Sequence, residues 1–218
     1  MYNLISNIIA NRIKLILAEV VSKEQFGFLG NHQILEAVGL TQEVLPTIKV
    51  RNLDALVLKM DLIKVYDRVN WVFLRLLLLH IGLNLTTINW IMVYVTSANF
   101  AVLINGDPTK FLDASRGIHL AFPLSPLLLL LVIDGLSLMI EDMRKQGRLL
   151  GIRYSSSLVI THLLFVDDVV LFGRGRGSLG EWKDFNKLIC LFCSASGMRI
   201  SRIMSSFLHH GVGDELYL

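Results

Sequence analysis

The chain has 218 residues, of which 53% are hydrophobic and 18% are charged, and its formal net charge is +3 at pH 7. This length fits one large domain with a substantial core, and the composition is apolar for a soluble protein. A membrane-spanning helix is not expected, because the most apolar run, residues 127–133, is far shorter than the roughly 20 residues that a span needs. The weakly basic charge permits nucleic-acid binding without arguing for it. The start of the chain lacks the basic segment and cleavage site of a signal peptide, so we expect an intracellular location, in the nucleus or cytoplasm.

Apolar spacing and turn residues predict helices and strands in alternation. In chain order we expect helices over residues 2–21 and 32–47, a strand over 55–60, helices over 70–80 and from 86, a hairpin of strands 100–104 and 110–112, a helix over 125–144, a hairpin of strands 159–165 and 169–172, and a helix over 178–197. Strands that pair as hairpins and are separated by helices predict an α+β domain with an antiparallel sheet. Helices on one face of this sheet would leave the other face open for a duplex.

The ends of several elements carry specific signals. Asn70 can cap the helix that follows it, and Gly82 can end that helix. Asn105-Gly106 is a preferred tight turn of a β-hairpin. Pro126 stands at the tolerated first position of a helix, and Ser178 to Glu181 form a capping box.

Carboxylates interrupt two apolar segments. Asp61 follows the mainly apolar run Leu56-Val57-Leu58-Lys59-Met60, and Asp167-Asp168 stand between two apolar runs, residues 163–166 and 169–172. A lone carboxylate in such a place would lose hydration without compensation. If the three converge, they could hold two Mg²⁺ ions, with Mn²⁺ as a substitute, because hard divalent ions prefer oxygen ligands and bind phosphates. The alternative is that the Asp pair forms a hairpin turn and Asp61 caps a helix.

A close family resemblance rests on these segments and others. The blocks that carry it are Glu24–Phe28 with the helix before it, Leu58–Asp61 with Tyr66–Trp71, Ser115–Gly117 with Pro123–Pro126, Phe165–Asp168, and Ser196–Ile200. Over residues 2–212 and in this order, they resemble the reverse transcriptase domain of a plant-type non-LTR (LINE-like) retrotransposon. The resemblance implies an RNA-directed DNA polymerase, a nucleotidyltransferase acting on an RNA template, a DNA primer and dNTPs.

The resemblance also implies an architecture and a set of site residues. We expect a partial reverse transcriptase domain over residues 1–218, with a right-hand polymerase palm in residues 51–218, a remnant of helical fingers in residues 1–50, and no thumb. Catalysis and metal binding would fall to Asp61, Asp167 and Asp168. Two further residues are substrate-binding candidates. Tyr66 would pack against the sugar and screen the 2′-hydroxyl, unless it is a core aromatic, and Arg116 would contact a phosphate or the template, unless it is a plain surface arginine.

The sequence also departs from the family pattern. Leu120-Ala121 stand where the family usually has Gln-Gly, Met204 and Ser201 stand where it has Lys and Asn, and His32 replaces a fingers Arg. The missing Lys is a candidate proton donor to the leaving pyrophosphate. We therefore expect an impaired polymerase. The alternative is a catalytically silent retroelement remnant that at most binds nucleic acid.

Two cysteines, Cys190 and Cys193, form a C-x-x-C pattern inside an apolar helical run. This pattern can indicate redox chemistry or half of a zinc site, but no second Cys/His pair has suitable spacing. We expect both thiols to be unbonded and buried in the core.

Overall fold

A computed structural model of the chain describes residues 2–29, 34–53, 55–97, 99–118, 123–155, 158–175, 179–201 and 205–210. The helices are α1 Tyr2–Val20, α2 Ile34–Val50, α3 Val65–Arg68, α4 Trp71–His80, α5 Leu85–Thr96, α6 Ser125–Lys145 and α7 Leu179–Ser196. The strands are β1 Gln25–Phe26, β2 Ala55–Asp61, β3 Asn99–Phe100, β4 Leu103–Ile104, β5 Asp107–Pro108, β6 Leu112–Asp113, β7 Ile152–Arg153, β8 Val159–Ile160, β9 His162–Phe165, β10 Asp168–Arg174 and β11 Ser206–His210. The expected helices and hairpins are present with shifted ends, but the strand expected over residues 159–165 is divided into β8, which pairs with β7, and β9, which pairs with β10.

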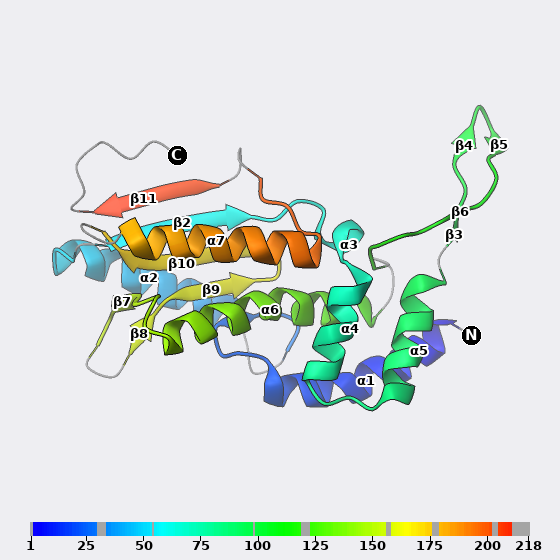
Figure 1. The fold of residues 1–218 in the computed structure, drawn as a ribbon, viewed down its shortest axis with the longest axis horizontal. Coiled ribbons are helices and arrows are strands. Elements are labelled where there is room, and N and C mark those ends of the chain that lie inside the picture. Colours follow the sequence, from blue (N-terminus) through cyan, green and yellow to red (C-terminus); the bar gives the residue numbers. More distant parts are fainter. Residues whose placement is uncertain are drawn as a thin grey trace.

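A five-stranded sheet in the order β1-β9-β10-β2-β11 forms the centre of the molecule (Figure 1). Strand β10 pairs antiparallel with β9 and β2, and β2 pairs antiparallel with β11. The sheet is not wholly antiparallel as predicted, because the short edge strand β1 runs parallel to β9. A two-residue strand far from its partner in sequence leaves no local signal of its direction.

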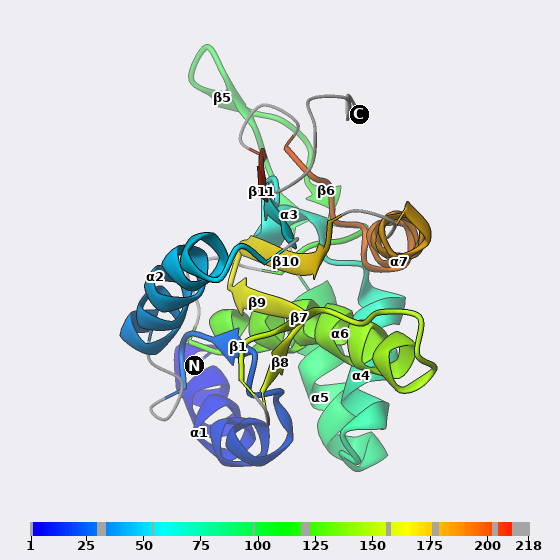
Figure 2. The same cartoon turned by 90° about the vertical axis from the view of Figure 1, so that its left-hand side faces the viewer.

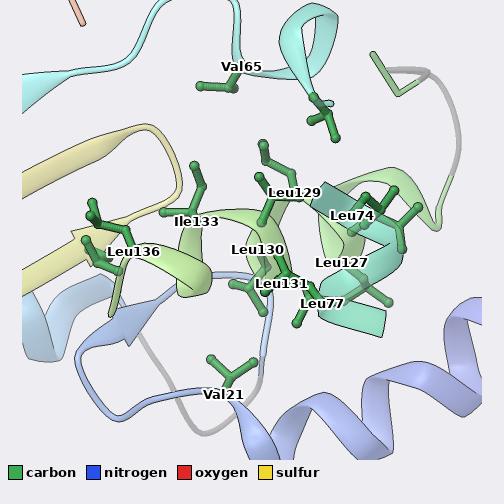
Figure 3. Close-up of a cluster of buried hydrophobic side chains, with 14 of the residues drawn as sticks. Val21, Val65, Leu74, Leu77, Leu127, Leu129, Leu130, Leu131, Ile133 and Leu136 are labelled. Carbon is green, nitrogen blue, oxygen red and sulfur yellow. The ribbon is translucent and has the colours of Figure 1, made fainter. Parts of the chain in front are cut away.

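One face of the sheet packs on α6 and α7 (Figure 2). Side chains alternate between faces along a strand, so Met60, Val169 and Leu171 point together into this main core. Helix α6 lies at its centre, and residues 127–133 are all buried. A helix that is apolar all round must be surrounded by protein. Figure 3 shows its leucines between Val65 of α3, Leu74 and Leu77 of α4, and Val21 after α1.

The apolar composition is therefore accounted for by this core. No helix among the described residues combines the length and apolar character that a membrane crossing requires.

The opposite face is not left fully open, contrary to our expectation. Helix α2 and the β7–β8 hairpin cover it, and Val44 and Ile48 of α2 join Val57, Val170 and Phe172 in a second buried cluster. This cover lies over the far ends of the strands from Asp61. Figure 2 shows α2 on the side of the sheet opposite to α7. Among the described residues, the end of this face that carries Asp61 and Asp168 is the part left partly exposed.

A hairpin built from β3, β4, β5 and β6 projects from the body after α5 (Figure 1). Its tip is the predicted Asn105-Gly106 turn, where φ is +53° and +95° respectively. Positive φ at both central residues is what a type I′ turn requires, so the expected hairpin is confirmed.

Helix ends follow the expected cap signals in part. The Asn70 side chain accepts hydrogen bonds from Val72 N (2.8 Å) and Phe73 N (3.3 Å), as predicted for the start of α4. The Glu181 carboxylate accepts from the backbone of Leu150, Gly151 and Arg174 at 2.8–3.1 Å. It thereby ties α7 to two neighbouring segments. The expected capping box does not include this role of Glu181. Its other member, Ser178, lies outside the described residues.

The expectation for the cysteines is partly wrong. Both are free, but Cys190 is exposed and Cys193 is half-buried. The buried face of α7 is formed by Phe185, Leu188, Ile189 and Phe192, and Cys190 falls outside this stripe. Burial raises the pKa of the Cys193 thiol, and the neighbouring Cys190 adds to this increase.

Candidate active site

Two of the three predicted carboxylates face each other across the central strands. Asp61 is the last residue of β2, Asp168 is the first of β10, and the two are direct partners in the ladder. Direct partners in an antiparallel pair point to the same face with Cβ atoms about 4.5–5.5 Å apart. The structure therefore brings Asp61 and Asp168 together.

Asp167 lies at the same end of the sheet, but the structure does not place its side chain in one group with those of Asp61 and Asp168. Its carbonyl accepts a hydrogen bond from Leu62 N at 3.0 Å, which ties the hairpin turn to the residue after Asp61. Its side chain is exposed, whereas Asp61 and Asp168 are half-buried. Within the described part of the chain, no three His, Cys, Asp or Glu side chains stand close enough to hold a metal ion.

The turn that carries Asp167 has an unusual backbone. Val166 adopts φ +53°, a conformation that a β-branched residue rarely takes. A positive φ at the first of two central residues is the pattern of a type II′ hairpin, where glycine is the usual residue. Such strain persists only where the surroundings impose it.

The segment around β1 supplies those surroundings. Phe26 stacks on Phe165 with ring centroids 5.8 Å apart, and Leu164 N donates to the Glu24 carbonyl at 2.8 Å. Gly27 has φ +131°, and a Cβ there would lie 3.0 Å from a methyl group of Val166. Glycine thus lets this segment lie directly against the turn and support it.

Tyr66 lies on the one-turn helix α3, close to the carboxylates. The side chain is half-buried and packs against the main core. Burial raises the pKa of the Tyr66 hydroxyl, and the charge of Asp167 raises it further. The second effect requires the two side chains to be near each other.

The segment with Arg116 is docked on the same one-turn helix. Gly117 N donates to the Val69 carbonyl at 2.8 Å, and Ile118 N donates to the Tyr66 carbonyl at 2.7 Å. Gly117 has φ +92°, and a Cβ there would lie 3.0 Å from the Asp67 carbonyl oxygen. The close approach depends on glycine.

Arg116 itself is exposed and lines an open pocket of about 330 Å³. Asp67 and Ser115 share this pocket. The side chain is therefore accessible to a ligand, and no contact with the described residues distinguishes it from a surface arginine.

The Ser196–Ile200 block lies beside the block formed by Leu58–Asp61 and Tyr66–Trp71. Ser201 N donates to the Asp61 carbonyl, Ile63 N donates to the Arg199 carbonyl, and Asn70 N donates to the Ser196 carbonyl, each at 2.8 Å. These bonds hold the segment after α7 against the residues that follow β2. Leu120, Ala121, Met204 and His32 lie outside the described residues.

Lys59 is a site residue that our sequence interpretation did not single out. Its Nζ lies 3.0 Å from Asp168 Oδ1. The period-2 alternation of a strand places Lys59 on the same face as Asp61, so the pattern of the strand already contained the signal.

Comparison with known proteins identifies the family of the chain. A sequence model of the reverse transcriptase (RNA-dependent DNA polymerase) family matches residues 1–209. Because this match covers nearly the whole chain, the protein belongs to the reverse transcriptase family.

The resemblance to the reverse transcriptase domain of a plant-type non-LTR retrotransposon is confirmed, and two relatives agree with it. An uncharacterized mitochondrial protein of Arabidopsis thaliana is 46% identical over 67 residues, which are 30% of this chain and 55% of that protein. The uncharacterized 149 kDa protein of transposon TX1 from Xenopus laevis is 26% identical over 211 residues, which are 96% of this chain and 16% of that protein. The chain thus spans only part of each relative.

Solved structures share the fold. Apo telomerase from Candida tropicalis, truncated from its C-terminal domain, has a TM-score of 0.61 at 14% identity, over 98% of this chain and 41% of that one. Telomerase from Candida albicans in complex with a TWJ fragment of telomeric RNA has a TM-score of 0.67 at 12% identity, over 93% of this chain and 35% of that one. At these identities the likeness concerns the fold alone, and it confirms the expected polymerase fold.

Proposed function

We propose that this chain is the part of a retroelement polymerase that performs RNA-directed DNA synthesis, by metal-dependent nucleotidyl transfer at Asp61, Asp167 and Asp168. The observation that carries the proposal is the register of β2 and β10, which sets Asp61 opposite Asp168 at the open end of the sheet. We assign residues 51–218 mainly to the palm and residues 1–50 to a remnant of the fingers. The substrates would be an RNA template, a DNA primer and dNTPs.

The oxygen donors of these three carboxylates suit the metal that this chemistry needs, and the Asp167 side chain would have to turn towards Asp61 and Asp168 to complete the site. Asp61 and Asp168 share one face, Asp167 is adjacent to them, and all three are at least partly accessible. Oxygen donors of this kind suit Mg²⁺, and Mn²⁺ would substitute for it. When bound, the metal would activate the primer hydroxyl and neutralise the triphosphate. The chain itself contributes the fixed strand ends and the supported turn that hold these side chains.

Two other residues take roles in binding substrate. Tyr66 would lie against the sugar of the incoming nucleotide with the part of its ring that the core does not cover, because the side chain is only half-buried. Arg116 would contact a phosphate or the template from the pocket beside Asp67.

We further propose that the activity is weak. Leu120 and Ala121 would remove a nucleotide-positioning amide and a close backbone approach, and Met204 would remove a candidate general acid. A positioned proton donor typically contributes about 10²- to 10⁴-fold in rate. None of these substitutions alters Asp61, Asp167 or Asp168.

A second candidate function is nucleic-acid binding without catalysis. It is favoured by the ion pair of Asp168 with Lys59, which engages one of the proposed metal ligands with a cation of the chain itself. The two functions differ in whether a bound primer is extended.

Primer extension on an RNA template with Mg²⁺ tests the proposal. We expect slow extension by the chain as given, loss of extension in Asp167→Asn, and no change in Asp107→Asn, an exposed carboxylate on the projecting hairpin. The triple change Leu120→Gln, Ala121→Gly, Met204→Lys should raise the rate by about 10²-fold or more. Fluorescence anisotropy with the same primer–template should show binding in every variant.

Two different outcomes would contradict the proposal. Extension that survives Asp167→Asn would refute the assignment of the site. Duplex binding with no extension, even in the folded triple variant, would establish the second function instead.

A further inference from the structure

Lys59 stands inside the carboxylate end of the sheet. It lies two residues before Asp61 on β2, and its direct partner on β10 is Val170, two residues after Asp168. Its ammonium group is 3.0 Å from Asp168 Oδ1, and the two side chains are 47% and 36% exposed. The lysine therefore shares one face with both carboxylates.

The facing carboxylates need a positive charge between or beside them. Like charges directly opposite each other in a sheet destabilise the pair. Among the described residues, Lys59 supplies the ion pair that the structure shows at these two carboxylates. A divalent cation bound there would be repelled by the same ammonium group, because both are positively charged.

We propose that Lys59 is a positioning residue that neutralises Asp168 when no divalent cation is bound, and that its charge sets the concentration of cation needed to fill the site. This inference rests on the proposed metal-dependent function. It adds a counter-charge, carried by the chain, that holds Asp61 and Asp168 in register and competes with the metal. A plain surface ion pair would do neither, since exposed pairs often contribute nothing measurable.

Metal affinity gives the first test. Free Mn²⁺ is followed by electron paramagnetic resonance as the protein is titrated, which requires no catalysis. Removing one positive charge about 5 Å from a divalent ion should tighten its binding by about 3- to 20-fold at moderate salt. We therefore expect Lys59→Met to bind Mn²⁺ more tightly than the unmodified chain by this factor.

Two matched variants control for the charge at position 59 and for the net charge of the protein. Lys59→Arg keeps the positive charge, and we expect its affinity to stay within about twofold of the unmodified chain. Lys14→Met removes one charge from an exposed position on α1, so it repeats the change in net charge away from the site, and its affinity should not change.

Melting in EDTA gives a second test that needs no metal. Lys59→Met should lower the melting temperature of the unmodified chain and should have no such effect in an Asp168→Asn background. This double-mutant cycle isolates the coupling between the two side chains.

The outcomes separate this inference from the proposed function. Equal Mn²⁺ affinity in Lys59→Met and in the unmodified chain would overturn the role of Lys59 and leave the metal site standing. Absence of Mn²⁺ binding in every variant would refute both. A tight site in Lys59→Met where the unmodified chain binds weakly would support the competition directly.

Discussion

Glycine decides how closely the blocks around the candidate active site approach one another. Gly117 brings the segment with Arg116 against α3, and Gly27 brings the β1 segment against Val166. A side chain at either place would force the backbone or its neighbour to move. The blocks of the family resemblance thus mark positions of close packing as well as positions of chemistry.

We expect Gly117→Ala to lower the free energy of unfolding by about 1–3 kcal/mol, because a Cβ would meet the Asp67 carbonyl in a backbone conformation that already disfavours one. Gly147→Ala is the matched control, since Gly147 also has positive φ (+72°), but an added Cβ would have no described atom within 4 Å apart from those of its chain neighbours. Urea denaturation of both variants measures the difference. Equal losses would mean that the conformation alone, and not the contact with α3, makes glycine necessary at position 117.

The residue scale also shows what sequence reasoning overlooked. The strain at Val166 could not be expected, because a β-branched residue is a poor choice for positive φ and no local pattern announces it. Lys59 was visible in principle, because strand alternation places it beside Asp61. It passed unnoticed because a lysine on a half-buried strand is ordinarily a solvated side chain.

At the scale of elements, periodicity and cap residues predicted most of what forms. The apolar run of α6 and the cap at Asn70 are local features, and the structure contains both as expected. Pairings across long stretches of chain were harder. The parallel pairing of β1 with β9 joins segments more than 100 residues apart, as between Gln25 and Leu164, and the cover of α2 over the second face includes contacts of similar separation with β8 and β10. Such contacts leave no periodic signal in either segment.

The contact between β9 and α6 contains a buried titratable group. His162 is 1% exposed, and its ring nitrogens lie 2.6 Å from Ser137 Oγ and 2.9 Å from Thr161 Oγ1. Burial lowers the pKa of His162 to about 4, although the charge of Glu141 opposes this shift. The imidazole is therefore neutral in the folded protein at pH 7.

Stability should consequently fall on acidification. Below its ordinary pKa of about 6.5, His162 takes up a proton in the unfolded chain before it does so in the folded one. Its contribution is fully present above pH 6.5 and is lost progressively as the pH falls towards 4, by up to about 3 kcal/mol. Urea denaturation at pH 7.5 and pH 5 should show this loss, and His162→Gln should reduce it. An identical pH dependence in His162→Gln would assign the loss to other groups.

At the scale of the whole molecule, the core and the site were predictable to different degrees. The composition required a large buried core, and the clusters on the two faces of the sheet provide it. The convergence of distant carboxylates followed from the family order of the blocks, and the register of β2 with β10 shows how two of them meet. The grouping of Asp167 with them depends on side-chain positions in a turn, which neither periodicity nor motif order determines.

The projecting hairpin leaves several apolar side chains exposed to solvent. Leu103, Ile104, Phe111 and Leu112 are 57–76% exposed on it. Apolar side chains gathered on an exposed projection promote association in solution. The hairpin pairs with itself, through β4 with β5 and β3 with β6, so its removal should leave the body of the molecule intact.

Because Phe100 and Leu112 are direct partners in the β3–β6 ladder, replacing residues 101–111 by Asn-Gly would close the hairpin with a two-residue turn. We expect this variant to keep its melting temperature within a few degrees of the unmodified chain, since loop ends that already meet cost little to join. Sedimentation velocity should show less self-association than in the unmodified chain. The full-length variant Leu103→Lys, Ile104→Lys, Phe111→Lys separates the two effects, because it keeps the projection and removes its apolar character. A large fall in the melting temperature of the shortened chain would show that the hairpin stabilises the body. Unchanged self-association in both variants would show that another surface causes it.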